Sequence, residues 1–430
     1  MSYADSLPDN VRRRARIDAT LSTIFGTICE QAIDTNTLLI LYLMLLGGGD
    51  SFSMLSTAIV GLCGVFLSIP SAGVVNKLGL RLSYSVAIYL QVSMLVVIAG
   101  APFVGSMAPM VVMGAFVVYC VLRSFYSATW FPLVDNFLRA DERGKFFGNM
   151  RFTYMIFNML LIFSVGFIMG EKPPLWIIQI YFIIAGAGLL WRKIFLDRLP
   201  FHCDAATSRV EIIPALKISL ANSALVGFSF YYGFLTMAAL SAFPLAVVYM
   251  KSCLGFGAKT IMIITSLGVG GQIAAYGAVG FLMKNMPRKY FTLMIHLMLL
   301  AVIGGLLLTA PSQSWSCYFL AGLFFFNGMA VAFLNCLGST EMLSLARPGN
   351  KVMAMAFTTT FQSIGNAVGR LGMTLLMASG MLAPMWQCGS RSFTHFHALF
   401  IFSFVMTLLG LLFLVLTPAM VPERSDYYAP

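Results

Sequence analysis

Two carboxylates, Glu30 and Asp34, lie four residues apart in an otherwise apolar stretch of the sequence. If that stretch is a helix, this spacing places both acids on one face. Two carboxylates this close disfavour joint ionisation, so one of them should hold a proton. The pair is therefore a candidate site for H⁺ or Na⁺. The alternative is that Arg123 neutralises one or both acids in a static internal ion pair.

Arg123 itself belongs to a row of polar and aromatic residues at helical spacing. The row consists of Tyr119, Arg123, Tyr126 and Trp130. Aromatic rings on either side of a fixed charge suit the recognition of a polar organic solute. The alternative is ordinary packing, with the tyrosine hydroxyls bonded internally. An arginine in the middle of an apolar stretch is unusual for ordinary packing, so we favour the interpretation that this row lines a binding cavity.

A second row of polar residues, spaced by four, occurs in a later apolar stretch. It consists of Thr358, Gln362, Asn366, Arg370 and Thr374. A charge at the centre of a bilayer costs about 2.5–3.5 kcal/mol, so Arg370 should face a cavity or the seam between two halves of the protein. Glycines on another face of this stretch should allow another helix to approach closely. They are Gly365, Gly369 and Gly372.

The candidate substrate-binding residues come from these two rows and from two further apolar stretches. They are Tyr119, Arg123, Tyr126, Trp130, Tyr232, Asn327, Gln362, Asn366 and Arg370. Tyr232 and Asn327 are weaker candidates, because polar side chains also join membrane helices by hydrogen bonds. Arg123 and Arg370 come from opposite halves of the chain, and each offers a planar fork of donors, so they are candidates for a substrate clamp. The alternative is that both are static partners of the two acids.

Membrane helices have to position these residues. The 430-residue chain is 59% hydrophobic and only 10% charged, whereas soluble domains carry roughly 25% charged residues. Because ~20 apolar residues cross the hydrocarbon core as a helix and lipid cannot satisfy open backbone groups, long apolar stretches predict transmembrane helices. Twelve such stretches lie near 18–46, 51–75, 81–104, 107–138, 150–170, 174–196, 217–250, 258–283, 290–310, 315–345, 355–380 and 393–418.

The chain has a net charge of +11, and its basic residues are distributed as expected for a membrane protein. If the N-terminus is cytoplasmic, 21 Lys and Arg residues fall on the cytoplasmic side and 4 on the opposite side. This bias is the positive-inside rule, and it predicts that both termini are cytoplasmic. The basic charge therefore does not indicate nucleic acid as a partner.

The two halves of the sequence repeat. Gly73, Lys77 and Arg81 recur 207 residues later as Gly280, Lys284 and Arg288, and Asp135 and Lys145 recur 206 residues later as Glu341 and Lys351. The near-constant offset predicts a duplicated six-helix unit. The alternative is that evenly spaced helices bring loop charges into register by themselves.

Two loops resemble motifs of the major facilitator superfamily of secondary transporters. One loop contains Gly73, Lys77, Gly79 and Arg81, with Asn76 where that family usually has Asp; the other runs from Asp135 to Gly148 and contains Glu142, Arg143, Gly144 and Lys145. The resemblance covers residues 15–420. It implies an all-α membrane protein of twelve transmembrane helices in two pseudo-symmetric six-helix bundles.

In that family, charges in these loops latch the two halves in the outward-open state. The residues to which the resemblance gives a gating role are Gly73, Lys77, Gly79, Arg81, Asp135, Arg143, Lys284, Arg288 and Glu341. The alternative role is to anchor helix ends at the lipid surface. The fifth stretch lacks the Gly-x-x-x-Gly-Pro run of many drug/proton antiporters, so the subfamily is not identified.

No catalytic, metal or cofactor site is predicted. The eight cysteines stand alone and read as packing residues. His202, Cys203 and Asp204 are adjacent in the chain, so their side chains do not converge as a catalytic triad must. No phosphate-binding loop supports transport driven by ATP.

The sequence thus predicts a secondary active transporter of a small polar organic solute, working by alternating access and coupled to H⁺ or Na⁺. The alternatives are an exporter of drugs or lipids with the same fold and, from another class, a polytopic membrane enzyme or sensor. The expected partners are the solute, the ion and the lipid of the cytoplasmic (inner) membrane, and we expect a monomer. The expected domains are a cytoplasmic tail at 1–17, a six-helix bundle at 18–196, a cytoplasmic loop at 197–216, a second bundle at 217–418 and a cytoplasmic tail at 419–430.

Overall fold

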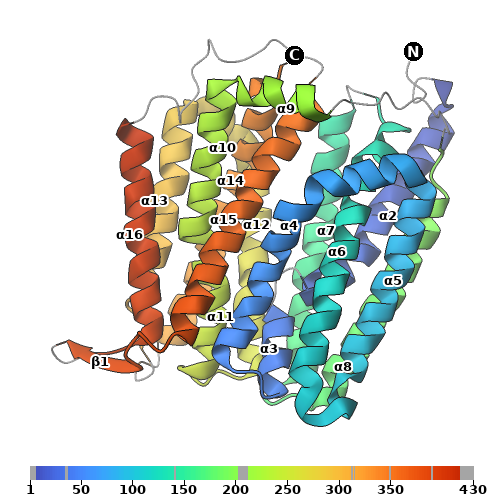
Figure 1. The fold of residues 1–430 in the computed structure, drawn as a ribbon. Coiled ribbons are helices and arrows are strands. Elements are labelled where there is room, and N and C mark those ends of the chain that lie inside the picture. Colours follow the sequence, from blue (N-terminus) through green and yellow to red (C-terminus); the bar gives the residue numbers. More distant parts are fainter. Residues whose placement is uncertain are drawn as a thin grey trace. The chain divides into compact units, whose positions relative to one another are not determined.

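The computed structural model describes residues 6–33, 37–139, 142–201, 212–310, 313, 315–347, 350–388 and 391–416. These residues are mostly helical (Figure 1), as predicted for an all-α membrane fold. The strands among them form one antiparallel pair, which the sequence analysis did not predict. The chain divides into two compact units.

Unit 1 comprises Met1–Gly49 and Phe66–Arg209, and unit 2 comprises Asp50–Val65 and Val210–Pro430. Helix α4 (Asp50–Leu78) begins in unit 2 and continues into unit 1. The other elements of unit 1 are α2 (Asp9–Ile33), α3 (Thr37–Leu45), α5 (Leu80–Gly100), the 3₁₀ helix η1 (Ala101–Met107), α6 (Ala108–Asp135), α7 (Arg143–Met169) and α8 (Leu175–Asp197). The other elements of unit 2 are α9 (Ile212–Leu220), α10 (Ser223–Leu235), the π-helix η2 (Thr236–Leu240), α11 (Ala242–Ser252), α12 (Ala258–Asn285), α13 (Arg288–Leu306), α14 (Ser316–Leu345), α15 (Lys351–Ala378), β1 (Met385–Cys388), β2 (Arg391–Thr394) and α16 (His395–Leu416).

Nine segments of the described residues are helical, apolar and long enough to cross a membrane. They are Asp50–Ser68, Leu80–Val134, Phe146–Met169, Leu175–Asp197, Ser223–Ser252, Ala258–Asn285, Arg288–Leu306, Ser316–Met342 and His395–Leu416. The segment Leu80–Val134 contains both α5 and α6, which the sequence analysis predicted as two spans. The total of twelve spans is consistent with the fold and stays a prediction.

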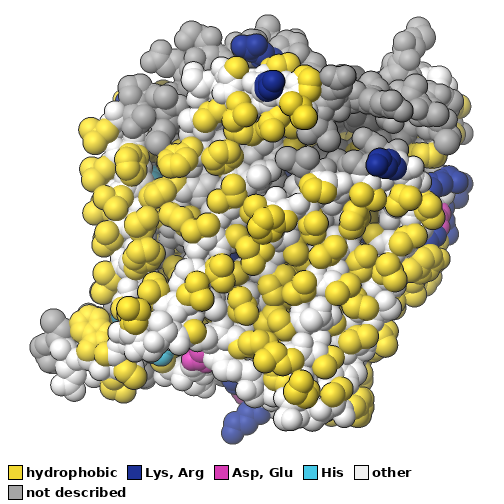
Figure 2. Space-filling view, viewed as in Figure 1, with side chains coloured by type: hydrophobic (Ala, Val, Ile, Leu, Met, Phe, Trp, Pro, Cys, Tyr) yellow, Lys and Arg dark blue, Asp and Glu magenta, His cyan; other side chains and the backbone are white. Residues whose placement is uncertain are grey.

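Many of the large apolar side chains are exposed on the outer faces of the helices. On α8, Phe182 and Ala185 are buried, whereas Ile180, Ile183 and Ile184 are exposed. Figure 2 shows hydrophobic side chains over much of the described part of the face in view. Apolar surface of this extent is unfavourable in water, so these faces belong against lipid.

Helix α2 begins at Asp9, earlier than the predicted start near residue 18. The Pro8 carbonyl accepts a hydrogen bond from the Arg12 backbone N–H at 3.1 Å and closes the first turn. Asp9 places negative charge in that turn, which the helix dipole favours. Part of the segment predicted as a tail is therefore helical and continues into the first membrane helix.

The seventh predicted span, 217–250, also starts differently. Helix α9 ends at Leu220, and α10 begins at Ser223. The Asn222 side chain accepts a hydrogen bond from the Leu225 backbone N–H at 3.1 Å and so caps the N-terminus of α10. Asn222 therefore ends one helix and starts the next, although the sequence analysis placed it inside the span.

Glycines of α15 lie directly against the backbone of α10 and η2. A Cβ atom on Gly365 would lie 2.0 Å from the Gly233 carbonyl oxygen, and one on Gly369 would lie 2.5 Å from that of Met237. The predicted close approach is confirmed at these two positions. Gly372 differs, because a Cβ atom there would have no neighbour within 4 Å.

His397 joins the β1–β2 hairpin to the helices of unit 2. The Thr394 backbone N–H donates to His397 Nδ1 at 3.1 Å, and His397 Nε2 lies 3.0 Å from the Thr309 carbonyl oxygen just after α13. Because Nδ1 accepts a hydrogen bond, the proton of the neutral ring sits on Nε2 and is donated to Thr309. The hairpin is therefore held at a fixed place beside the start of α16.

Replacing His397 by alanine should loosen this hairpin. The Thr309 carbonyl would keep a hydrogen bond from the Tyr249 hydroxyl, at 3.0 Å, but the Thr394 N–H would lose its nitrogen acceptor at a cost of about 1–3 kcal/mol. Hydrogen exchange at the Thr394 amide should therefore become faster in His397→Ala than in the control His395→Ala. Equal exchange rates in the two variants would contradict the role assigned to His397.

Candidate functional site

A partly buried ion pair joins α2 and α8 in unit 1. Arg192 Nη1 donates to Glu30 Oε1 at 2.9 Å. The Arg192 Cζ atom also lies 4.1 Å from the centroid of the Tyr126 ring on α6, which is a cation–π contact. We call Glu30, Tyr126 and Arg192 the Arg192 cluster.

The two charges of this pair differ in exposure. The Arg192 side chain is 8% exposed, whereas the Glu30 side chain is 31% exposed. The carboxylate can therefore be reached by water or a small cation, but the guanidinium depends on Glu30 for its countercharge. Arg192 Nε is buried and makes no hydrogen bond with a described residue.

The sequence makes room for the guanidinium at Gly26. A Cβ atom at that position would lie 2.3 Å from Arg192 Nη1. Arg192 is one of the 21 Lys and Arg residues that the sequence analysis assigned to the cytoplasmic side, and its role here was not predicted. The available signal was its position inside 174–196, a stretch predicted to cross the membrane, because an arginine there needs a partner.

The aromatic row of α6 lies partly against α2. Tyr119 is buried, and its hydroxyl lies 3.0 Å from Cys29 Sγ. Tyr126 belongs to the Arg192 cluster, whereas Arg123 and Trp130 are half-buried. The structure therefore brings the predicted residues Tyr126 and Glu30 to one guanidinium.

Glu30 has a partner that the sequence analysis did not consider. Glu30 pairs with Arg192 of α8, because α8 runs to Asp197 and carries Arg192 to the face of α2. A static pair of Arg123 with the acids stays an open alternative. Asp34 lies outside the described residues. A coupling pair of two acids on one helix face therefore stays a prediction.

In unit 2, Tyr232 of α10 bonds with amides from two other helices. Its hydroxyl donates to Asn335 Oδ1 of α14 at 3.2 Å and accepts from Gln362 Nε2 of α15 at 3.3 Å. We call Tyr232, Asn335 and Gln362 the Tyr232 cluster. The predicted binding residues Tyr232 and Gln362 thus meet in the structure.

Two asparagines near this cluster in sequence have an open acceptor. The side-chain oxygens of Asn327 on α14 and Asn366 on α15 are buried and make no hydrogen bond with a described residue. Leaving a buried acceptor unbonded costs about 1–3 kcal/mol. Each oxygen therefore favours the binding of water or of a solute that donates hydrogen bonds.

Arg370 of α15 contacts the first part of α4 within unit 2. Its Nη1 donates to the Thr57 carbonyl oxygen at 2.9 Å. Its Nε is buried and makes no hydrogen bond with a described residue. A substrate clamp made with Arg123 stays a prediction.

Two of the predicted gating residues form an ion pair in unit 2. Arg288 Nη1 at the start of α13 lies 3.2 Å from Glu341 Oε1 near the end of α14. Glu341 is buried, whereas Arg288 is exposed. The sequence repeat relates this pair to Arg81 and Asp135 of unit 1.

The remaining gating residues lie in or beside helix ends. Four of them are exposed, namely Lys77, Gly79, Arg81 and Lys284. Gly79 has a φ of +82° between α4 and α5, a backbone conformation that favours glycine. The side chains of Asp135 and Arg143, and the surroundings of Gly73, lie outside what the structure describes. A gating role for all nine residues stays a prediction.

The sequence analysis did not predict a further charge cluster in unit 1. Arg12 Nη1 and Arg16 Nη1 lie 3.4 Å and 3.3 Å from the two carboxylate oxygens of Glu142. Arg12 is buried and also pairs with Asp9, which holds the pKa of the Asp9 carboxyl below its usual value. These ion pairs tie the first turns of α2 to the residue that precedes α7.

These sites offer groups that can bind a solute or an ion. The part of the chain that the structure describes holds no group of three His, Cys, Asp or Glu side chains able to bind a metal ion. The Arg192 cluster instead offers a carboxylate, a guanidinium and an aromatic ring. The Tyr232 cluster and the open acceptors offer uncharged hydrogen-bonding groups.

Solved structures of transporters share the fold of this chain. The nucleoside transporter NupG aligns over 96% of this chain and 100% of its own, with a TM-score of 0.67 and 14% identity. A D-xylose–proton symporter aligns over 97% and 98%, with a TM-score of 0.69 and 14% identity. The xylose transporter XylE from E. coli, in an inward-open conformation, aligns over 96% of both chains, with a TM-score of 0.66 and 13% identity.

No family model matches the sequence, and no curated protein does. At these identities the structural likeness shows the fold. The chain is a multi-pass membrane protein with the fold of the major facilitator superfamily. The resemblance drawn from the loop motifs is thereby confirmed at the level of the fold.

Proposed function

We propose that this protein is a secondary active transporter that moves a small polar organic solute across the cytoplasmic membrane by alternating access, coupled to H⁺ or Na⁺. The Arg192 cluster is the observation that carries the proposal. Ionisable groups in the membrane interior are expensive and mark ion or solute pathways in transport proteins. The shared fold of transporters supports the same reading.

Glu30 is the proposed coupling residue. Its carboxylate is partly exposed and holds Arg192 through one contact of 2.9 Å. A proton or Na⁺ that arrives on the exposed side competes with Arg192 for the same oxygens. Ion binding would therefore release the guanidinium to donate to a solute, which gives ion and solute a coupling free energy.

The open acceptors of unit 2 support a polar solute. The buried oxygens of Asn327 and Asn366 gain most from a solute that carries hydroxyl or amine donors. Nucleosides and pentoses have such groups, and structurally similar proteins are named as transporters of nucleosides and xylose. These compounds are therefore the first to screen.

Other functions fit these sites less well. A drug or lipid with few donors would leave the two asparagine oxygens unbonded, which disfavours the exporter. The solved structures compared above are transporters, which disfavours a polytopic enzyme. The excess of Lys and Arg on the cytoplasmic side remains when Arg192 is left out, so we propose that both termini are cytoplasmic.

The test separates coupling from movement of the solute. Nucleosides and pentoses are first screened for a rise in the melting midpoint of the purified protein, and a hit is then used in vesicles. In Glu30→Gln the amide oxygen can still accept from Arg192, but the site loses its charge. This variant should lose accumulation driven by a pH or Na⁺ gradient and keep exchange of labelled for unlabelled solute.

The matched control is Asp197→Asn, which removes an exposed acid from the end of α8. It should keep both accumulation and exchange. Normal gradient-driven accumulation in Glu30→Gln would remove Glu30 from the coupling role. Failure of the unmodified protein to move any stabilising solute would count against transport of this solute class.

A further inference from the structure

The β1–β2 hairpin and the residues just before it expose apolar side chains near the start of α16. Met381 is 80% exposed and Met385 is 67% exposed. Trp386 of β1 and Phe393 of β2 pair across the strands, with ring centroids 4.6 Å apart and an angle of 20° between the rings. We call Met381, Met385, Trp386 and Phe393 the hairpin patch. In water, apolar surface exposed in this way is unfavourable.

The hairpin changes from apolar to polar along its length. The pair Trp386–Phe393 is followed toward the turn by the pair Gln387–Ser392, whose side chains are exposed. The apolar part therefore lies next to the helices of unit 2, and the polar part lies farther from them. Figure 2 shows hydrophobic side chains on the hairpin beside the helices.

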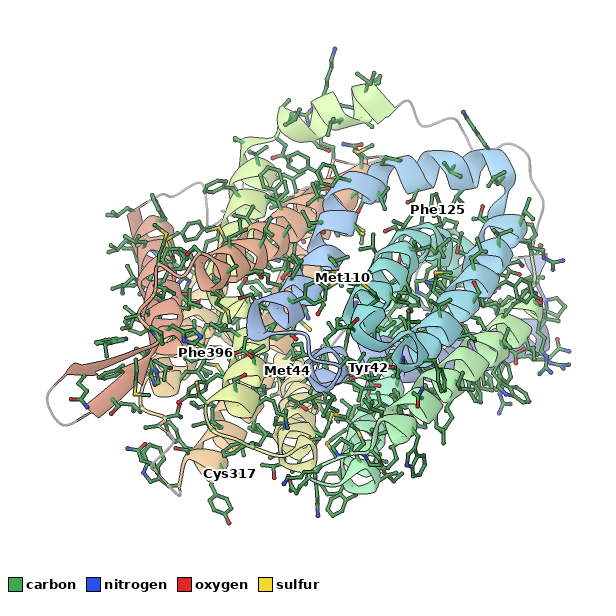
Figure 3. All side chains as sticks on the ribbon, turned by 60° about the horizontal axis from the view of Figure 1, so that its bottom comes forward. Tyr42, Met44, Met110, Phe125, Cys317 and Phe396 are labelled. Atoms are coloured by element: carbon green, nitrogen blue, oxygen red, sulfur yellow. The ribbon has the colours of Figure 1, made fainter. Side chains whose placement is uncertain are left out.

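The base of the hairpin is fixed. The Phe393 ring contacts the ring of the buried His397 edge-on at 5.3 Å, in addition to the hydrogen bonds of His397. Phe396, labelled in Figure 3, is buried beside this base, with its ring centroid 5.6 Å from that of Tyr249. The direction of the hairpin is therefore set by the packing of unit 2.

This direction runs across the axis of α16. Figure 1 shows the hairpin projecting sideways from the start of α16, whereas the helix itself runs along the bundle. Exposed Phe402, Val405 and Leu409 belong to the lipid-facing surface of α16. The hairpin patch thus continues that surface at the level where the membrane helix starts.

We propose that the hairpin lies in the interfacial layer of the lipid bilayer and that Trp386, stacked on Phe393, anchors the start of α16 at the depth of the lipid headgroups. Tryptophan favours this layer, because its ring is apolar and its N–H is polar. The polar pair Gln387–Ser392 then meets headgroups and water. The proposal rests on the membrane fold and is independent of the transport activity.

The chain has five tryptophans, so the fluorescence of Trp386 has to be obtained as the difference between two proteins. Fluorescence of the unmodified protein and of Trp386→Phe is compared in phosphatidylcholine vesicles. The lipids carry bromine either near the headgroup or near the end of the acyl chain. The difference signal should lose most of its intensity with shallow bromines, less with deep bromines, and little with aqueous acrylamide.

Water around Trp386 would overturn the proposal: full quenching by acrylamide and none by either lipid. Contact of the patch with a second copy of the chain would also overturn it. That outcome would appear as a disulfide-linked dimer of Met385→Cys in vesicles, together with no quenching by the brominated lipids. A second measurement uses trypsin, which can cut after Arg391. Cleavage there in vesicles should be faster in Trp386→Ala than in Gln387→Ala, and equal rates would count against anchoring by Trp386.

Discussion

Replacing Glu30 by alanine should destabilise the protein by about 3–5 kcal/mol, the usual loss when one partner of a buried ion pair is removed. Glu30 is the countercharge of Arg192, whose side chain is only 8% exposed. The substitution leaves the guanidinium charged, buried and without its bond of 2.9 Å. Thermal unfolding of the purified protein, followed by size-exclusion chromatography, measures the loss as a lower melting midpoint.

Two further variants make this prediction specific. Lys193→Ala breaks the neighbouring ion pair with Asp197, whose acid is exposed, and should cost about 1 kcal/mol or less. Arg192→Met added to Glu30→Ala removes the unpaired charge and keeps an unbranched side chain that is apolar. The double variant should therefore be more stable than Glu30→Ala alone. A double variant that is less stable would show that the ion pair is not what Glu30 contributes.

Changing Gly365 to alanine should also destabilise the protein strongly, because the new methyl group has no room. The new Cβ atom would lie 2.0 Å from the Gly233 carbonyl oxygen, so the backbones of α15 and α10 would have to separate. Overpacking against backbone typically costs about 1–3 kcal/mol, and here a shift of two helices places the expected loss at the upper end. The melting midpoint and the yield of folded protein should both fall.

The same substitution at Gly372 is the matched control on the same helix. A Cβ atom there meets nothing within 4 Å. Alanine is favoured over glycine inside a helix by about 1 kcal/mol, so Gly372→Ala should be neutral or stabilising. Similar melting midpoints for the two variants would contradict the close contact of α10 and α15.

The fold class and much of the organisation could be read from the sequence, because both depend on local properties. The length of an apolar stretch fixes whether a helix can cross the membrane, wherever the other helices lie. The glycine face of α15 was visible from spacing alone, and Gly365 and Gly369 lie where it predicted. The hairpin was not visible, because its four-residue strands carry no long periodic pattern.

For the candidate site too, some features could be predicted from the sequence and others could not. The sequence alone determined that Glu30 is an acid in an apolar helix and must have a partner or a purpose, because lipid solvates no charge. It could not determine that the partner is Arg192, which lies 162 residues away, because that choice depends on how α2 and α8 rotate and pack. The tertiary structure alone decided this contact, the meeting of Tyr232 with Asn335 and Gln362, and the fixing of the hairpin by His397. Each brings together side chains from separate elements, and only packing in three dimensions sets which of their faces meet.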